Sequence, residues 1–127
     1  MTEEEEYKRE VIVIRIENDN KRLLDIYKIG EEKDRLSKNA YKNVFERVSY
    51  ALSSSILMNL SDQVPTLEER IRFYFEDFYF DNVPTSSRTD IRYYITAFKR
   101  FIMILMREKE IEEDEYSSLF SMLSEYL

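Results

Sequence analysis

Hydrophobic side chains recur at helical spacing through the middle of the chain. Between residues 31 and 60 they fall at i, i+4, i+7, i+11 and i+14/i+15, at Tyr41, Phe45, Val48, Leu52 and Ser55/Ile56. One continuous stripe at this period is typical of a helix that packs one face against a core. The pattern therefore predicts a helix over residues 31–60.

Two more helices are predicted in the C-terminal third. Residues 88–109 carry apolar side chains at i, i+3, i+4, i+7, i+11 and i+14, namely Ile91, Tyr94, Ile95, Phe98, Ile102 and Leu105. Residues 113–126 repeat this spacing with Tyr116, Leu119, Phe120, Leu123 and Tyr126. The acidic run Glu112–Glu115 opens this last segment and suits the positive end of a helix dipole.

Capping residues mark two helix starts. Thr66 is followed three residues later by Glu69, and Ser87 is followed by Asp90, which is the arrangement of a capping box. Both pairs come shortly after a Val-Pro dipeptide, which favours an extended backbone. We therefore predict that one helix begins at Thr66 and another at Ser87.

The N-terminal region is harder to assign. Residues 10–16 read Glu-Val-Ile-Val-Ile-Arg-Ile, and such a density of β-branched side chains favours a strand. No second run of this kind follows, so a strand here would need another chain as its partner, and a helical turn is the alternative. We predict an extended segment over residues 10–17 and leave the helical alternative open.

Breaks in the pattern set the predicted architecture. The cap-rich run Asn18–Asn20 predicts an interruption, and Gly30 is placed to end the short helix that follows it. We predict an all-α, single-domain protein over residues 1–127, a compact bundle of about five helices. In this scheme residues 1–9 are an acidic, flexible terminus, residues 10–17 are extended, and residues 20–127 form the bundle.

The composition excludes most familiar catalytic sites. The chain has no Cys and no His, which removes thiol and imidazole nucleophiles and the usual zinc and iron–sulfur ligands. A single glycine excludes phosphate-binding glycine-rich loops. Asp77 and Asp81 are four residues apart, as a Mg²⁺ site on a helix would need, but an ion pair between Arg72 and Glu76 is the simpler interpretation of this segment. We therefore expect no enzyme activity, no metal and no cofactor.

Charge and hydropathy bear on partners and location. The net charge is −7, and residues 108–127 hold seven acids against one base. A pI near 4.8 disfavours a dedicated duplex-DNA binder. The longest apolar run, Phe101–Met106, is too short to span a membrane, and no leader pattern is present, so we expect a cytoplasmic protein. The absence of Cys and the scarcity of Gln resemble the proteins of thermophilic archaea and their viruses.

The aromatic content of two helices suggests a partner. Six aromatic residues between 73 and 80 would surround most of a helix, and Phe101–Met106 would do the same on the next one. Since a small bundle encloses few helices completely, we expect part of this surface to be covered by another protein. The function we predict is non-catalytic protein–protein interaction, as a homodimer or as a subunit of a larger assembly. The predicted partner-binding residues are Phe75, Phe78, Tyr79, Phe101, Ile104 and Met106.

Two alternatives remain open. Basic residues beside Tyr93 and Tyr94 would suit single-stranded nucleic acid, which is bound by charge neutralisation and base stacking. This predicted nucleic-acid face consists of Arg88, Arg92, Lys99, Arg100 and Arg107. The second alternative is an acidic inhibitor or decoy that presents Glu112–Glu115 and the N-terminal acids Glu3–Glu6 to a basic partner surface.

Overall fold

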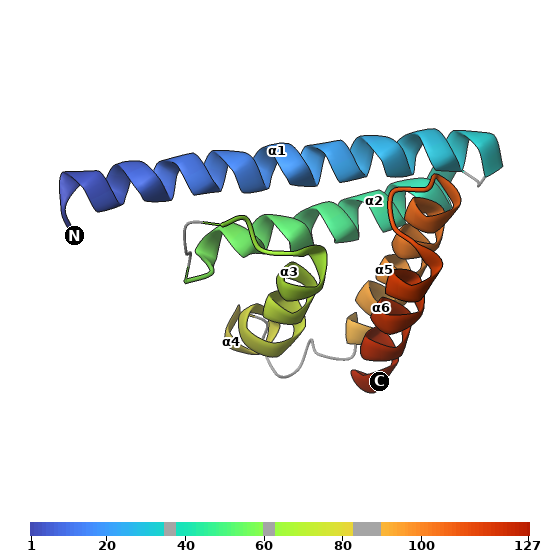
Figure 1. The fold of residues 1–127 in the computed structure, drawn as a ribbon. Coiled ribbons are helices and arrows are strands. Elements are labelled where there is room, and N and C mark those ends of the chain that lie inside the picture. Colours follow the sequence, from blue (N-terminus) through green and yellow to red (C-terminus); the bar gives the residue numbers. More distant parts are fainter. Residues whose placement is uncertain (35–37, 60–62, 83–89) are drawn as a thin grey trace.

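A computed structural model describes residues 1–34, 38–59, 63–82 and 90–127 (Figure 1). Its elements in order are α1 (Glu3–Asp34), α2 (Lys38–Ser53), η1 (Ser54–Leu57), α3 (Leu67–Phe73), η2 (Tyr74–Phe78), α4 (Tyr79–Asn82), α5 (Ile91–Arg107) and α6 (Glu113–Glu125). All the regular structure in the described ranges is helical, which confirms the predicted all-α bundle.

The helices pack around α5. This helix contacts α1, α2 and α6, and α1 also packs along α2. Figure 1 shows α1 running along one side of the molecule, with α3–α4 on the far side of α2 and with α5–α6 crossing near the C-terminal end of α1. The N-terminal third of α1 reaches past the other helices, and residues 1–10 are exposed. The molecule therefore consists of a bundle and a projecting helical arm, which is the N-terminal third of α1.

Residues 10–17 are helical, so the predicted extended segment is wrong and the helical alternative is confirmed. Ile12 and Ile16 stand four apart and are buried, together with Leu23 and Tyr27 further along the same face. β-branched residues have only a weak preference for strands, and here a buried helical face with tertiary contacts overrides it. Residues 3–9, which we expected to belong to a flexible terminus, are part of the same helix. The helix begins after Thr2, whose hydroxyl accepts a hydrogen bond from Glu5 N at 3.2 Å.

The predicted interruption at Asn18–Asn20 is also absent, because Asp19 and Asn20 bind tertiary partners instead of capping a helix. Asn20 is buried and donates to the carbonyl of Leu52 at 3.1 Å, while its own carbonyl accepts from Arg70 at 2.5 Å. Asp19 accepts from Arg70 at 2.7 Å and from Arg22 at 2.9 Å. Three potential helix breakers are thus accommodated within one continuous helix.

Gly30 does not end a helix, as the sequence predicted, but lies inside α1 where that helix crosses α5. A Cβ atom at this position would clash with Ile104 Cγ2. The missing side chain therefore permits the close approach of α1 and α5. The helix ends four residues later at Asp34, and α2 begins at Lys38, so the helix predicted over residues 31–60 is divided between α1, α2 and η1.

The predicted stripe on α2 lies against the core. Val48 and Leu52 are buried, and Tyr41 and Phe45 are partly buried. The helix then tightens into the 3₁₀ turn η1, where the hydroxyl of Ser55 donates back to Leu52 O at 2.5 Å. Such bonds from serine to the preceding turn compete with regular helix geometry.

The C-terminal predictions agree closely with the structure. Thr66 and Glu69 form the predicted reciprocal capping box, with bonds of 3.0 and 3.1 Å. The predicted helix over 113–126 is α6, and the one over 88–109 is α5. The predicted Ser87 cap lies outside the described residues. Asp90 makes no capping bond and instead accepts from the hydroxyl of Tyr79 at 2.6 Å.

Candidate functional site

The predicted partner-binding patch is largely internal. Phe75, Tyr79, Phe101 and Ile104 are buried in the chain's own core, while Phe78 and Met106 are partly buried. The prediction that these side chains form an exposed surface is therefore wrong for the first four. The chain hides more apolar helical surface than its size suggested.

A wide helical turn explains part of this burial. The segment Tyr74–Phe78 is a π-helix, so its side chains advance around the axis by a smaller angle than in an α-helix. Tyr74, Phe75 and Tyr79 are consequently all buried. Phe75 stacks on Tyr126 near the end of α6, with ring centroids 4.9 Å apart, and meets Phe98 of α5 at 5.8 Å.

The position of α5 between three helices explains the rest. Phe101 meets the ring of Tyr27 on α1, with centroids 5.5 Å apart, and Ile104 packs where α1 passes closest. Because α1, α2 and α6 all pack against α5, most of its apolar surface is covered within one chain.

The predicted nucleic-acid face is mostly neutralised within the molecule. Arg100 pairs with Glu31 at 2.5 Å and with Asp34 at 2.6 Å, and Arg107 also pairs with Asp34, at 3.0 Å. Lys99 lies over the ring of Phe120, 4.4 Å from its centroid. Arg92 is exposed, and Arg88 lies outside the described residues. The four of these basic residues that the structure describes therefore do not present a common charged surface.

The carboxylate of Glu31 is the centre of a buried polar network. It accepts from the hydroxyl of Tyr27 at 2.5 Å and from the Arg100 guanidinium on two atoms. The hydrogen bond from Arg100 holds the pKa of Asp34 below its ordinary range, and burial raises the pKa of Tyr27 well above its ordinary range. Every member of the network has a partner, so it fixes α1 against α5 and does not offer a reactive group.

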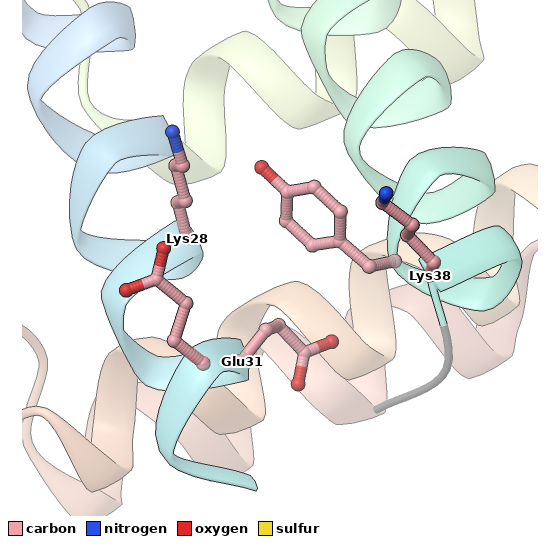
Figure 2. A pocket seen from close by; sticks show the side chains of 5 residues that line it. Lys28, Glu31 and Lys38 are labelled. Atoms are coloured by element: carbon pink, nitrogen blue, oxygen red, sulfur yellow. The ribbon is translucent and has the colours of Figure 1, made fainter. Parts of the chain in front are cut away.

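A pocket of about 290 Å³ opens beside this network, between the end of α1 and the start of α2. Its lining residues are Lys28, Glu31, Glu32, Lys38 and Tyr41. Figure 2 shows Lys28 and Lys38 on opposite sides of the pocket, with Glu31 below them. Burial raises the pKa of Tyr41, and the negative charge of nearby Glu32 raises it further. Because the Glu31 oxygens already accept from Tyr27 and Arg100, the floor of the pocket is a satisfied ion pair.

The carboxylates considered for magnesium do not form a site. Asp77 and Asp81 are both exposed, and the predicted pair between Arg72 and Glu76 is present at 3.4 Å. Within the part of the chain that the structure describes, no group of three acidic residues is arranged to hold a metal ion. None of the helices in those ranges combines the length and apolarity needed to cross a membrane.

The outer face of the α1 arm is the clearest unpartnered apolar surface in the described ranges. Tyr7 is 67% exposed and Ile14 is 57% exposed, and Val11 between them is partly buried. These positions follow each other by four and three residues, so they share one face of the helix. Ile12 and Ile16 occupy the opposite face and enter the core. We call Tyr7, Val11 and Ile14 the arm stripe.

The arm stripe was not among the predicted partner-binding residues, because residues 10–16 were interpreted as a strand. The strand interpretation placed Ile12, Ile14 and Ile16 on one face, whereas in a helix Ile14 points away from the other two. The signal that identifies the stripe was present in the sequence as the spacing of Tyr7, Val11 and Ile14. Reading it required knowing that the segment is helical.

A second exposed feature joins α2 and α5. Tyr93 is 60% exposed, and the guanidinium of Arg47 lies over its ring at 5.1 Å from the centroid. Tyr50 nearby is also exposed and touches Phe78 edge-on at 6.0 Å. This surface combines aromatic rings with a cation.

Comparisons with known proteins add no constraint on this arrangement. No family model matches the chain, and no match was found among curated proteins or solved structures. The function is therefore inferred from the surfaces of the chain itself.

Proposed function

We propose that this chain is a non-catalytic protein–protein interaction protein that binds through the outer face of the α1 arm. The observation that carries the proposal is the exposed arm stripe on a helix that projects beyond the bundle. A helix exposed in this way is weakly stable alone, because most helical stability in proteins comes from packing an apolar face. Covering the stripe with another protein would supply that packing.

The charge of the arm supports a protein partner. Glu3, Glu4, Glu5 and Glu6 form its first turn, where the helix dipole favours acidic groups. An acidic terminus repels phosphates but tolerates a protein surface that carries lysine or arginine. Apolar positions bordered by charged ones are also typical of helices that dock on a partner helix or in a groove.

A second candidate is the binding of single-stranded nucleic acid at the Arg47–Tyr93 surface. It is favoured by the exposed Tyr93 ring and by the exposed Arg92 beside it. Base stacking on such a ring with a neighbouring cation is the usual recognition mode. Arg100 and Arg107 would not contribute, because Glu31 and Asp34 neutralise them.

Affinity purification with two matched variants tests the main proposal. Ile14→Glu places a charge in the middle of the arm stripe, and we expect it to reduce the bound protein at least about tenfold. Ile29→Glu is the control, because Ile29 is 50% exposed on the same helix but lies far from the stripe. Each sample is divided and one half is treated with nuclease, so that protein bridged to the bait by nucleic acid is recognised by its loss.

The two variants separate the candidates. Protein that is retained by the wild type and by Ile29→Glu, and lost with Ile14→Glu, supports the arm. Equal retention by all three baits contradicts it. Loss of binding only after nuclease treatment, together with sensitivity to Tyr93→Ala, would favour the nucleic-acid candidate.

A further inference from the structure

We propose that the partner of the α1 arm is the arm of a second copy of this chain, paired antiparallel to it. The inference rests on the proposed function, since it assigns an occupant to the same surface. It is carried by the spacing of the exposed residues along α1 and by the charges at the two ends of that spacing.

The outer face of α1 has the spacing of a coiled-coil seam. Starting at Glu4, exposed or partly buried residues follow at alternating steps of three and four, at Glu4, Tyr7, Val11, Ile14, Asn18 and Lys21. These steps keep side chains on the line along which two helices meet. The seam lies opposite Ile12 and Ile16, which hold α1 on the bundle. Pairing along the seam therefore leaves the core contacts of α1 unchanged.

In one antiparallel register, each seam residue lies opposite another seam residue of the partner. With Val11 opposite the partner's Ile14, Tyr7 meets the partner's Asn18 and Glu4 meets the partner's Lys21. Two-fold symmetry repeats each of these contacts, which is the self-complementarity that a closed dimer needs. The apolar residues thus lie at the centre of the overlap, and opposite charges lie at both of its ends.

Other arrangements are less favourable. Sliding the copies to bring Tyr7 opposite the partner's Val11 would also place Ile14 against the partner's Glu4. Parallel pairing would bring Glu4 against the partner's Glu4 and the acidic first turns together, at a cost from like charges. The polar Asn18 within the seam further restricts the register, as a single asparagine does in coiled coils.

The fold leaves room for this dimer. Residues 1–10 are exposed, and the bundle covers only the inner face of α1. Because the seam and the bundle lie on opposite faces of α1, a partner helix can run along residues 4–21 while each bundle stays on the outer side of its own helix. Three apolar side chains in each copy make a small interface, so we expect a dissociation constant on the order of 10–100 µM.

Sedimentation equilibrium on the purified chain tests the pairing. We expect the apparent mass to rise from 15.5 kDa toward twice that value as the concentration passes through the micromolar range. Ile14→Glu should weaken the dimer at least about tenfold. Ile29→Glu should leave it unchanged, because Ile29 lies beyond the overlap.

A charge exchange tests the direction of the arms. Glu4→Lys alone and Lys21→Glu alone should each weaken the dimer about threefold or more, because each creates like-charged contacts at both ends. The double variant restores opposite charges and should return to within about twofold of the wild type. In a parallel pair Glu4 never meets Lys21, so the double variant would show no such recovery.

Disulfide formation gives an independent readout, because the chain has no cysteine of its own. A mixture of Glu4→Cys and Lys21→Cys chains should form a cross-linked dimer on mild oxidation. Neither variant alone should do so, since in the antiparallel register the two copies of position 4 lie about 25 Å apart along the helix. Cross-linking of each variant alone would indicate parallel arms and overturn the proposal.

The outcome also separates this inference from the proposed function. A chain that stays monomeric at 500 µM (a concentration about fivefold or more above the expected dissociation constant) overturns the dimer. If Ile14→Glu still abolishes binding of a different protein in that case, the arm remains the interaction surface and only its occupant was wrong.

Discussion

At the scale of single residues, the polar groups along α1 show how local signals were overruled. Asn18, Asp19 and Asn20 have the composition of a helix break, yet the last two bind the buried side chain of Arg70. A buried guanidinium requires acceptors, and Asp19 and Asn20 supply two of them from α1. The tertiary contact therefore stabilises a segment whose sequence favours caps and turns.

The Asp19–Arg70 pair leads to a pH-dependent prediction. Burial raises the pKa of Asp19, but hydrogen bonds from Arg22 and Arg70 outweigh it and leave the pKa below its ordinary range. A lowered pKa stabilises the fold at pH values above the pKa of the unfolded residue, and this stabilisation is lost as the pH falls through the native pKa. We expect Asp19→Asn to lower the free energy of unfolding by about 1–3 kcal/mol at pH 7.

Urea unfolding at pH 7, 5 and 3 measures this effect. The difference between wild type and Asp19→Asn should be full at pH 7 and 5, and should shrink below about pH 4, where the unfolded aspartate becomes protonated. Asp25→Asn, an exposed change on the same helix, should alter stability by less than about 0.5 kcal/mol at any of these pH values. A difference for Asp19→Asn that is independent of pH would show that the carboxylate charge is not what Arg70 requires.

At the scale of elements, the contact of α1 with α5 depends on Gly30. Alanine favours a helix over glycine by up to about 1 kcal/mol, but the added Cβ would meet Ile104 Cγ2. Because overpacking costs about 1–3 kcal/mol, we expect Gly30→Ala to lower the free energy of unfolding by about 0.5–2 kcal/mol. Chemical denaturation of the single variant provides this value.

A second variant identifies the cause. In the Ile104→Ala background the added Cβ has space, so Gly30→Ala should become neutral or slightly stabilising. An unchanged cost in that background would mean that the backbone, and not the Ile104 methyl, limits the approach of the two helices.

The sequence predicted the elements whose signals are local and missed those that depend on tertiary contacts. The Thr66–Glu69 capping box and the stripes of α2, α5 and α6 are local signals, and the structure has them, except that Phe120 of the α6 stripe is exposed. The extent of α1 was missed because its helical state depends on Ile12 and Ile16 reaching the core and on Asn20 reaching Leu52. The π-helical turn at Tyr74–Phe78 has no sequence signature that periodicity detects.

At the scale of the whole molecule, the candidate site also depended on tertiary contacts that local sequence signals do not predict. An excess of apolar surface indicated a partner, but residues such as Phe101 and Ile104 are enclosed by helices that are distant in sequence. The surface that remains exposed, the arm stripe, lay in the segment whose secondary structure was uncertain. Only the relative placement of the helices distinguishes a core aromatic residue from one that is available to a partner.

The division into bundle and arm predicts that two truncations will differ sharply. Deleting residues 1–8 removes exposed side chains and retains Arg9, which donates to Ile56 O at 3.4 Å, so the free energy of unfolding should fall by less than about 1 kcal/mol. Deleting residues 1–16 also removes the buried Ile12 and Ile16, and should lower it by about 3 kcal/mol or more. Thermal and urea unfolding at low micromolar concentration, where the arms are mostly unpaired, measure both. Similar losses for the two truncations would mean that the arm belongs to the bundle, and its outer face would then be an unsuitable place to seek a partner.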